Sequence, residues 1–341
     1  MIVTSRIRDL VVCVLLLAVA PSIGAAQSYT AGLMQLPSVQ MPGAIVPGVP
    51  VTVWYPAKAP EKTLRIGDAE LSVAVDAAPA RGRRRLILIS HGSDGGELAF
   101  SNLARLLARR GMVVAAPRHL GDSYDDRSAH GSSRQFGARP YQASYGLDVV
   151  LKNPKLSKII NPRRIGMLGY SAGGYTALVM AGAKPDRKNW IKHCQQPVEH
   201  GAACPLGGWL TSLGLRFLDD WDRPPETRIK SVVLLAPFGV MFDKAGLAGV
   251  KVPVLMLQPE RDEMLPNAFN GEWIRDSLPQ RPDYRTVPGG HFIFIQPCSP
   301  ELAASVPRVC ADPPGVNRGV IQNQTNEQIA DFFVRTLASA R

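Results

Sequence analysis

Short runs of apolar residues recur along the chain and predict the strands of a sheet. Runs that are almost entirely apolar are typical of strands buried on both faces. These runs are 86–90, 112–116, 231–236 and 252–257. The shorter strand-like runs are 51–55, 71–75, 164–169 and 284–287.

Segments with helical spacing separate these predicted strands. Leu103, Leu106 and Leu107 share one face of a predicted helix that Gly111 ends. Further helices are expected at 141–151, 172–183 and 328–337. Because strands and helices alternate, the chain is predicted to form an α/β fold with a mostly parallel, doubly wound sheet flanked by helices.

Two stretches interrupt this alternation. Residues 27–47 are rich in Pro and Gly and are expected to form an extended leader, which places the folded domain at 48–341. Residues 184–230 contain no clear strand and include three of the five tryptophans. Loops of such length are usually lids or binding loops, so a cap insertion is expected here. A helical insertion whose aromatic residues belong to the core is the alternative.

The first 26 residues are typical of a secretory signal peptide. Arg6 and Arg8 precede the apolar run 10–20, and small residues follow at 24–26. A helix of eleven apolar residues spans about 16 Å, which is too short for a hydrocarbon core of ~30 Å. We therefore predict an exported protein, periplasmic or secreted, with no stable membrane span.

The cysteines support export. Of the five cysteines, Cys13 would leave with the signal peptide. The remaining four form two pairs that are close in sequence, and an even number of cysteines in an exported chain is typical of disulfides. The sequence therefore predicts the disulfides Cys194–Cys204 and Cys298–Cys310.

A zinc site is the alternative for the first pair. His193, Cys194, His200 and Cys204 fall within twelve residues. Neither histidine has the tight spacing of common zinc motifs, and oxidation would remove the thiolates that zinc requires. Disulfides are therefore favoured, and no metal site is expected.

Length and charge exclude several classes of protein. A 341-residue chain with 45% hydrophobic residues can bury a sizeable core, which excludes a disulfide-stapled mini-protein and wholesale disorder. The net charge of +11 falls to +10 once residues 1–26 are removed, because Arg6, Arg8 and Asp9 are lost. The basic run 81–85 is expected to be a solvated turn that protects a strand edge. It has no interleaved aromatic residues, so no nucleic-acid partner is predicted.

The residues around Ser171 predict a nucleophile. Residues 169–173 read Gly-Tyr-Ser-Ala-Gly and match the G-x-S-x-G pattern. In this pattern the glycines permit a strained turn between a strand and a helix, which holds the serine hydroxyl clear of the sheet. The predicted strand 164–169 and helix 172–183 provide that context.

A serine hydroxyl needs a general base, and the order along the chain in this architecture is Ser, acid, His. Three histidines follow Ser171, and His193 and His200 lie in the predicted insertion. His291 follows two glycines in a turn after the last predicted strand. His291 is therefore the expected base.

The acid that orients the base should lie at a strand end between the serine and the histidine. Asp262 is favoured because it lies in the turn 259–266, directly after a predicted strand. Asp243 is the alternative acid. Glu260 and Glu263 are expected to be solvated turn residues.

Hydrolysis also needs two donors for the oxyanion of the tetrahedral intermediate. The backbone N–H of Ala172 is the first expected donor. The second is expected in the glycine-rich turn after the predicted strand 86–90, with Ser93 as the favoured residue. His91 is expected to brace this turn.

These motifs together resemble exported bacterial α/β-hydrolases of the dienelactone-hydrolase-like and platelet-activating-factor-acetylhydrolase-like groups. The segments that carry the resemblance are 90–92, 169–174, 259–266 and 290–292. The resemblance covers most of residues 48–315 and implies an α/β-hydrolase fold, a triad of Ser171, Asp262 and His291, and no cofactor. True dienelactone hydrolases have a cysteine nucleophile where this chain has serine, so the resemblance indicates fold more closely than substrate.

The expected function is therefore a serine hydrolase that cleaves small-molecule or lipid carboxylic esters through an acyl-enzyme intermediate. A lipase- or phospholipase-like enzyme and an amide-cleaving hydrolase are alternatives that use the same chemistry. A non-catalytic exported binding protein with a hydrolase fold is the alternative from another class.

Overall fold

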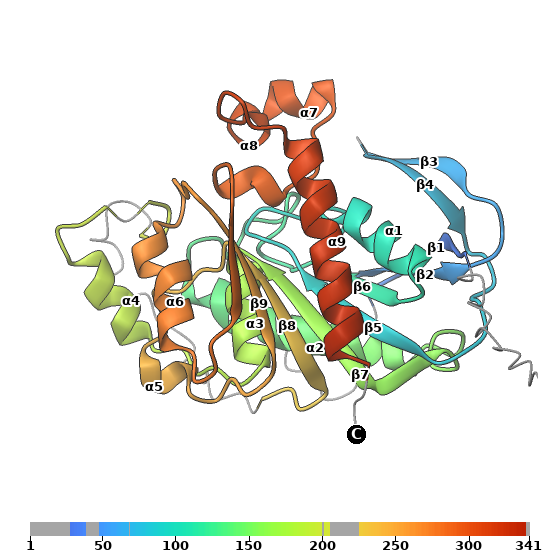
Figure 1. The fold of residues 1–341 in the computed structure, drawn as a ribbon, viewed down its shortest axis with the longest axis horizontal. Coiled ribbons are helices and arrows are strands. Elements are labelled where there is room, and N and C mark those ends of the chain that lie inside the picture. The colour runs from blue at the N-terminus through green and yellow to red at the C-terminus, as the bar shows by residue number, and fades with distance from the viewer. Residues whose placement is uncertain (1–27, 39–47, 68, 200, 205–224, 339–341) are drawn as a thin grey trace, which may run out of the picture.

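The computed structural model describes residues 28–38, 48–67, 69–199, 201–204 and 225–338. These residues form a sheet of ten strands in the order β10-β9-β8-β7-β5-β6-β2-β1-β4-β3 (Figure 1). Neighbouring strands from β10 to β6 are parallel, whereas β2 runs antiparallel to both β6 and β1. The sheet is thus mostly parallel, as the alternating pattern predicted.

The strands are β1 (Thr30–Leu36), β2 (Val51–Ala57), β3 (Lys62–Ile66), β4 (Ala69–Val75), β5 (Arg84–Ser90), β6 (Val113–Pro117), β7 (Ile160–Tyr170), β8 (Ile229–Leu235), β9 (Val254–Pro259) and β10 (Asp283–Val287). Every predicted strand corresponds to one of them. The additional strands β1 and β3 lie in the N-terminal, partly antiparallel half of the sheet.

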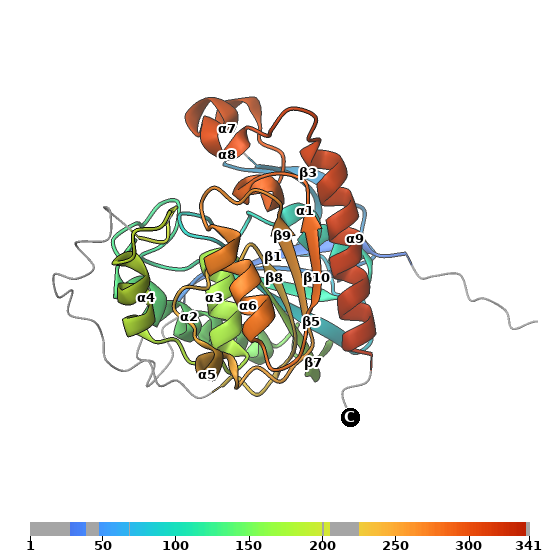
Figure 2. The same ribbon diagram turned by 60° about the vertical axis from the view of Figure 1, so that its left-hand side comes forward.

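The α-helices are α1 (Ser101–Arg109), α2 (Ser133–Lys152), α3 (Ala172–Met180), α4 (Arg187–Cys194), α5 (Lys244–Leu247), α6 (Gly271–Ser277), α7 (Pro300–Ser305), α8 (Pro307–Cys310) and α9 (Arg318–Thr336). Short 3-10 helices are η2 (Asn267–Phe269) and η3 (His291–Phe294). Two apolar clusters line the two faces of the sheet: α1 and α9 contribute to one, and α2, α3 and α6 to the other. Figure 2 shows α9 on one side of the sheet and α3 and α6 on the opposite side.

Strand β1 lies within the stretch expected to be an extended leader. It pairs with β2 along its whole length and buries Ala31, Leu33 and Met34. Gly32 interrupts these apolar residues, so no regular alternation marks the strand in the sequence. A Cβ atom at Gly32 would lie 2.4 Å from the ring of Tyr55, which explains why glycine is needed there. The ordered fold therefore begins before residue 48.

The basic run 81–85 does not protect a strand edge, contrary to expectation. Strand β5 is central, between β7 and β6. Arg84 donates a hydrogen bond to the Tyr29 hydroxyl at 2.8 Å and stacks on its ring. Arg85 donates to the carbonyl oxygens of Val334 and Leu337, each at 3.2 Å, near the C-terminal end of α9. These arginines therefore join distant parts of the chain.

Part of the expected cap at 184–230 belongs to the core. Trp190 of α4 is 1% exposed, and its ring contacts those of Phe136 and Phe238 edge-on. Its Nε1 donates a hydrogen bond to the carbonyl oxygen of Ala203 at 2.7 Å. These contacts agree with the alternative of a helical insertion that packs on the core.

Two expectations concern parts of the chain that the structure does not describe. The predicted signal peptide, residues 1–26, lies outside the described residues, as do residues 205–224 of the expected cap. Among the helices that are described, none combines the length and the apolar character that a membrane crossing requires.

Candidate active site

Ser171 lies in a sharp turn between β7 and α3. Its backbone has φ 54° and ψ −118°, a strained positive-φ conformation for a residue with a side chain. A Cβ atom on Gly169 would lie 2.0 Å from the carbonyl oxygen of Gly173, and one on Gly173 would lie 2.0 Å from that of Ser90. Gly169 therefore lets β7 and α3 approach closely enough to form this turn, and Gly173 lets α3 approach the end of β5.

His291 lies beside Ser171 although 120 positions separate them in the sequence. The His291 Nε2 atom is 3.0 Å from Ser171 Oγ. The chain reverses just before the histidine at Gly289, whose φ is 125°. The Tyr170 hydroxyl donates a hydrogen bond to the His291 carbonyl oxygen at 3.2 Å. His291 is 3% exposed, so its imidazole is buried as well as oriented.

Asp262 completes the arrangement. Both of its carboxylate oxygens lie 2.9 Å from His291 Nδ1, and Oδ1 also accepts the backbone N–H groups of Met264 at 3.0 Å and Leu265 at 2.7 Å. A carboxylate can only accept, so Nδ1 carries the proton and Nε2 can accept the proton of Ser171. The structure thus brings together the three side chains predicted as a triad.

Asp243 and Glu263, two other carboxylates near the predicted strand ends, each accept a hydrogen bond from a backbone N–H group. Asp243, the alternative acid, caps α5, where its Oδ1 accepts the N–H of Gly246 at 2.6 Å. Glu263, which was expected to be a solvated turn residue, accepts the backbone N–H of His291 at 3.0 Å. This contact was missed because a side chain that binds a backbone group leaves no pattern of residue types in the sequence.

The turn formed by residues 91–96, called the glycine turn, lies against Ser171. A Cβ atom on Gly92 would lie 3.3 Å from the Cβ of Ser171. Ser93, a predicted oxyanion donor, is in this turn, and its hydroxyl accepts a hydrogen bond from Gln135 Nε2 at 2.6 Å. The turn backbone is therefore close to the place where an oxyanion would form.

The other predicted donor, Ala172, is the first residue of α3. The first N–H groups of a helix have no acceptor within that helix. They also lie at the positive end of the helix dipole, which favours a negative charge. Ala172 therefore offers a backbone donor directly after Ser171.

Two buried histidines brace the glycine turn. His91 Nδ1 donates to the carbonyl oxygen of Gly92 at 2.7 Å, and His91 Nε2 accepts the N–H of His119 at 3.1 Å. Burial, assisted by the charge of Arg139, lowers the pKa of His91 to about 3. Burial also places the pKa of His119 well below its ordinary value. Both imidazoles are therefore neutral at pH 7.

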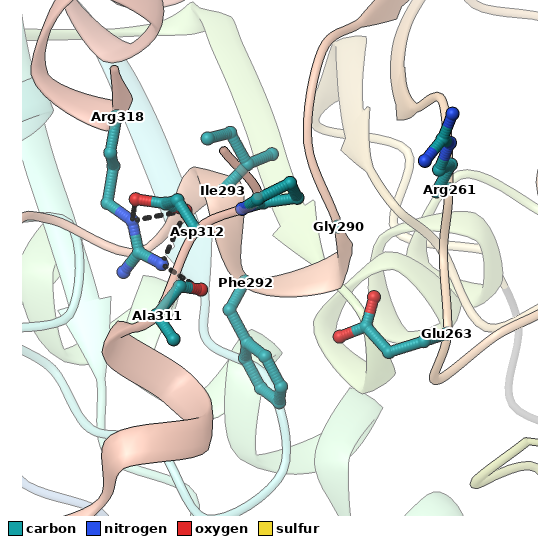
Figure 3. A pocket seen from close by; sticks show the side chains of 9 residues that line it. Arg261, Glu263, Gly290, Phe292, Ile293, Ala311, Asp312 and Arg318 are labelled. Carbon is teal, nitrogen blue, oxygen red and sulfur yellow. Dashed lines mark hydrogen bonds and ion pairs between the residues drawn. The ribbon is translucent and has the colours of Figure 1, made fainter. Parts of the chain in front are cut away.

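A cavity of about 340 Å³ adjoins the turns that carry the acid and the histidine (Figure 3). On one side it is lined by Arg261 and Glu263, and on the other by Arg318 and Asp312, which form an ion pair at 2.8 Å. Phe292 also lines the cavity. The positive and negative side chains balance, so the lining favours no ion of either sign.

One group of described side chains has the spacing of a metal site: Asp94, Asp122 and His130. Arg139 forms an ion pair with Asp122, and Arg127 forms one with Asp94 at 2.8 Å. These arginines already neutralise both carboxylates. The group therefore does not fit a metal site.

Both predicted cysteine pairs are joined, as Cys194–Cys204 and Cys298–Cys310. The second disulfide closes the segment of α7 and α8, which lies beyond the N-terminal end of α9 (Figure 1). Because Cys194 and Cys204 are bonded to each other, neither offers a thiolate to zinc, and His200 of that alternative lies outside the described residues.

Comparison with known proteins identifies the fold. No protein-family model matches the chain, and no curated protein sequence matches it. The structure matches 874 chains of solved structures, so the fold is widely shared. One of them is a ferulic acid esterase from Streptomyces cinnamoneus, with a TM-score of 0.61 and 19% identity over 94% of this chain and 92% of that chain. The predicted α/β-hydrolase fold is thereby confirmed.

Proposed function

We propose that the protein is a serine hydrolase that cleaves carboxylic esters through an acyl-enzyme intermediate. The observation that carries the proposal is the line of hydrogen bonds from Ser171 through His291 to Asp262, with 3.0 Å and 2.9 Å between the bonded atoms. The strained backbone of Ser171 adds support, because such conformations cluster at active sites. An idle serine in a tight turn would need neither the buried imidazole nor its carboxylate partner.

In the proposed reaction, His291 Nε2 takes the hydroxyl proton of Ser171 as Oγ attacks the ester carbonyl carbon. Asp262 keeps the proton of the imidazole on Nδ1 and stabilises the imidazolium that forms. Backbone N–H groups of Ala172 and Ser93 donate hydrogen bonds to the oxyanion. His291 then protonates the leaving alcohol, and the acyl group remains on Ser171.

Water completes the cycle. His291 takes a proton from a water molecule as the water oxygen attacks the acyl-enzyme carbonyl carbon. Collapse of the second intermediate breaks the bond to Ser171 Oγ, which recovers its proton from His291. The carboxylic acid leaves, and the enzyme returns to its starting state.

An ester is proposed as the substrate because the fold is shared with a ferulic acid esterase and the motifs resemble those of exported esterases. We propose a small-molecule or lipid ester within that class. The two disulfides and the predicted signal peptide support export to an oxidising compartment, either the periplasm or the medium.

The variant Ser171→Ala tests the proposal. The wild type is expected to hydrolyse p-nitrophenyl acetate and to be labelled at Ser171 by a fluorophosphonate probe. The variant should lose labelling, and its hydrolysis rate should fall by about 10⁴-fold or more. The matched control is Ser231→Ala, since Ser231 bonds only to Thr336 among the described side chains and should be dispensable for hydrolysis.

Two results would contradict the proposal in different ways. Equal hydrolysis by wild type and Ser171→Ala would refute Ser171 as the nucleophile. A folded wild type that neither hydrolyses esters nor takes the label would favour the non-catalytic binding protein.

A further inference from the structure

Helix α2 carries a buried charged side chain, Arg139, that faces the glycine turn. Arg139 is 1% exposed and forms an ion pair with Asp122, which is also 1% exposed. Removing two charges from water has a free-energy cost of several kcal/mol per ion, and an apolar pair of similar volume is often as stable. The pair therefore needs an explanation other than stability.

The guanidinium of Arg139 connects the glycine turn to the helix that follows the nucleophile. Its Nη2 donates to the carbonyl oxygen of His91 and approaches Ser90 Oγ at 3.5 Å. Its Nε donates to Thr176 Oγ1 at 3.2 Å, and Thr176 in turn donates to the carbonyl oxygen of Ala172 at 3.0 Å. One planar group thus ties together the two segments that carry the candidate oxyanion donors.

Asp122 holds the second half of the glycine turn. Its Oδ1 accepts the backbone N–H of Asp94 at 3.3 Å. Its Oδ2 accepts from Arg139 and, at 2.6 Å, from Gln135 Nε2, which also donates to Ser93 Oγ at 2.6 Å. Although burial acts to raise the pKa of Asp122, the charge of Arg139 and hydrogen bonds such as that from Gln135 lower it. The carboxylate is therefore charged at neutral pH.

The uncharged side chains next to this ion pair, Gln142, His119 and Ser90, have donors and acceptors that are consistent with these hydrogen bonds. Gln142 Nε2 donates to the carbonyl oxygen of Leu120 at 3.0 Å, so Gln142 Oε1 faces His119 Nδ1 at 3.0 Å. His119 Nδ1 must then be protonated, and its Nε2 accepts from Ser90 Oγ at 2.8 Å. The Ser90 oxygen can therefore accept from Arg139 without conflict.

We propose that Arg139 and Asp122 are positioning residues that fix the glycine turn, so that its backbone donors face the oxyanion formed at Ser171. The inference rests on the proposed function. It follows from where the pair binds the turn backbone, at His91 and at Asp94, on either side of Ser93. Donors held in place stabilise the transition state more than the bound substrate, so their loss should lower kcat and leave KM nearly unchanged.

Two variants test the proposal. Arg139→Lys keeps a positive charge beside Asp122 but loses the planar fork that reaches His91 and Thr176. The double variant Arg139→Met with Asp122→Leu replaces the buried ion pair with two apolar side chains. Folded proteins often tolerate this replacement. Near-ultraviolet circular dichroism gives the folded fraction, and kcat is expressed per folded enzyme.

For p-nitrophenyl acetate, we expect kcat to fall by about 10- to 100-fold in both variants, with KM within about threefold of the wild type. The rate of labelling by the fluorophosphonate should fall in parallel. The matched control is Arg228→Lys. Arg228 forms an ion pair at 2.6 Å with Asp148, which lies in α2 like Arg139, and has no described contact with the glycine turn. This control should keep wild-type kcat.

The outcomes separate this proposal from the proposed function. A folded variant with wild-type kcat, or one in which only KM changes, would overturn the positioning role. Failure of both variants to fold would assign the pair to stability alone and would overturn it as well. If the wild type neither hydrolyses the ester nor is labelled at Ser171, the proposed function is what fails.

Discussion

Ser171 is flanked by two regions that are held in different ways. The glycine turn is held by side chains from distant parts of the chain, above all the buried pair of Arg139 and Asp122. The turns that carry Asp262 and His291 are held largely by contacts with each other. Their backbones are joined by hydrogen bonds such as Arg261 N–H to the carbonyl oxygen of Gly289 at 3.2 Å.

This difference predicts how each region responds to substitution. A buried donor or acceptor that loses its partner destabilises the fold by about 1–3 kcal/mol, and more if it is charged. Substitutions in the network of the glycine turn should therefore affect both folding and chemistry. The acid and histidine turns are also joined by backbone hydrogen bonds, which survive a change of side chain. Substitutions there that keep the side-chain acceptors of Asp262 and Glu263 should therefore affect chemistry more than folding.

The largest effect is expected from Asp262→Asn. The asparagine amide can donate to His291 Nδ1, which would leave the proton on Nε2 and prevent it from accepting the proton of Ser171. We expect kcat for p-nitrophenyl acetate to fall by about 10⁴-fold with little loss of stability. The matched control is Asp243→Asn, because asparagine also caps helices well and should keep both stability and activity.

The opposite pattern would reverse the assignment of the acid. A large loss of activity in Asp243→Asn, with Asp262→Asn near wild type, would identify Asp243 as the residue that orients the base. Urea unfolding of both variants would show whether either loss of activity comes from loss of folding.

The two regions also differ in how far the sequence predicts them. Ser171, Asp262 and His291 each lie in a short local pattern at the end of a predicted strand, and the structure places all three within hydrogen-bonding distance in series. An ion pair between Arg139 of a helix and Asp122 of a loop has no such pattern. A lone arginine in a helix usually has its charge in solvent, so its burial could not be predicted.

The fold shows the same contrast between local sequence patterns and tertiary packing. Strands β5, β6, β8 and β9 were predicted because their runs are continuously apolar. Helix α2 was predicted only from residue 141, although it begins at Ser133, because Gly137 and Pro140 break the helical pattern. Helix α9 was predicted only from 328, because its first half is rich in polar side chains. Tertiary packing, rather than local preference, extends both helices.

A smaller effect is expected on the free energy of unfolding at low pH, and it should arise from His91 in the glycine turn. The pKa of His91 is about 3 in the folded protein, against an ordinary value of about 6.5 for an unfolded chain. Below pH 6.5 the unfolded state binds a proton that the folded state does not. The stability contributed by His91 is therefore complete above pH 6.5 and is lost as the pH falls toward 3, by about 2 kcal/mol at pH 5.

Comparison of the wild type with His91→Gln isolates this contribution. A hydrogen bond to Asp122 raises the pKa of His130, so His130 contributes stability at low pH that is lost as the pH rises. This opposite effect is common to both proteins and cancels. Urea unfolding at pH 7 and pH 5 should show a pH dependence smaller by about 2 kcal/mol in the variant, and an unchanged pH dependence would refute the assignment to His91.

The smallest effect is expected from Glu263→Gln in the histidine turn. Glutamine still offers an oxygen to the backbone N–H of His291, so the turn should keep its shape. The variant loses only the negative charge, which would stabilise a nearby imidazolium but is exposed to water and therefore screened. We expect kcat to fall by about three- to tenfold, with stability within about 0.5 kcal/mol of the wild type.

Glu260→Gln is the matched control, because its exposed side chain changes charge in the same turn without that contact, and it should retain full activity. A loss of stability above 2 kcal/mol in Glu263→Gln would contradict the distinction between the two regions, since it would show that the histidine turn also depends on a side-chain charge for folding.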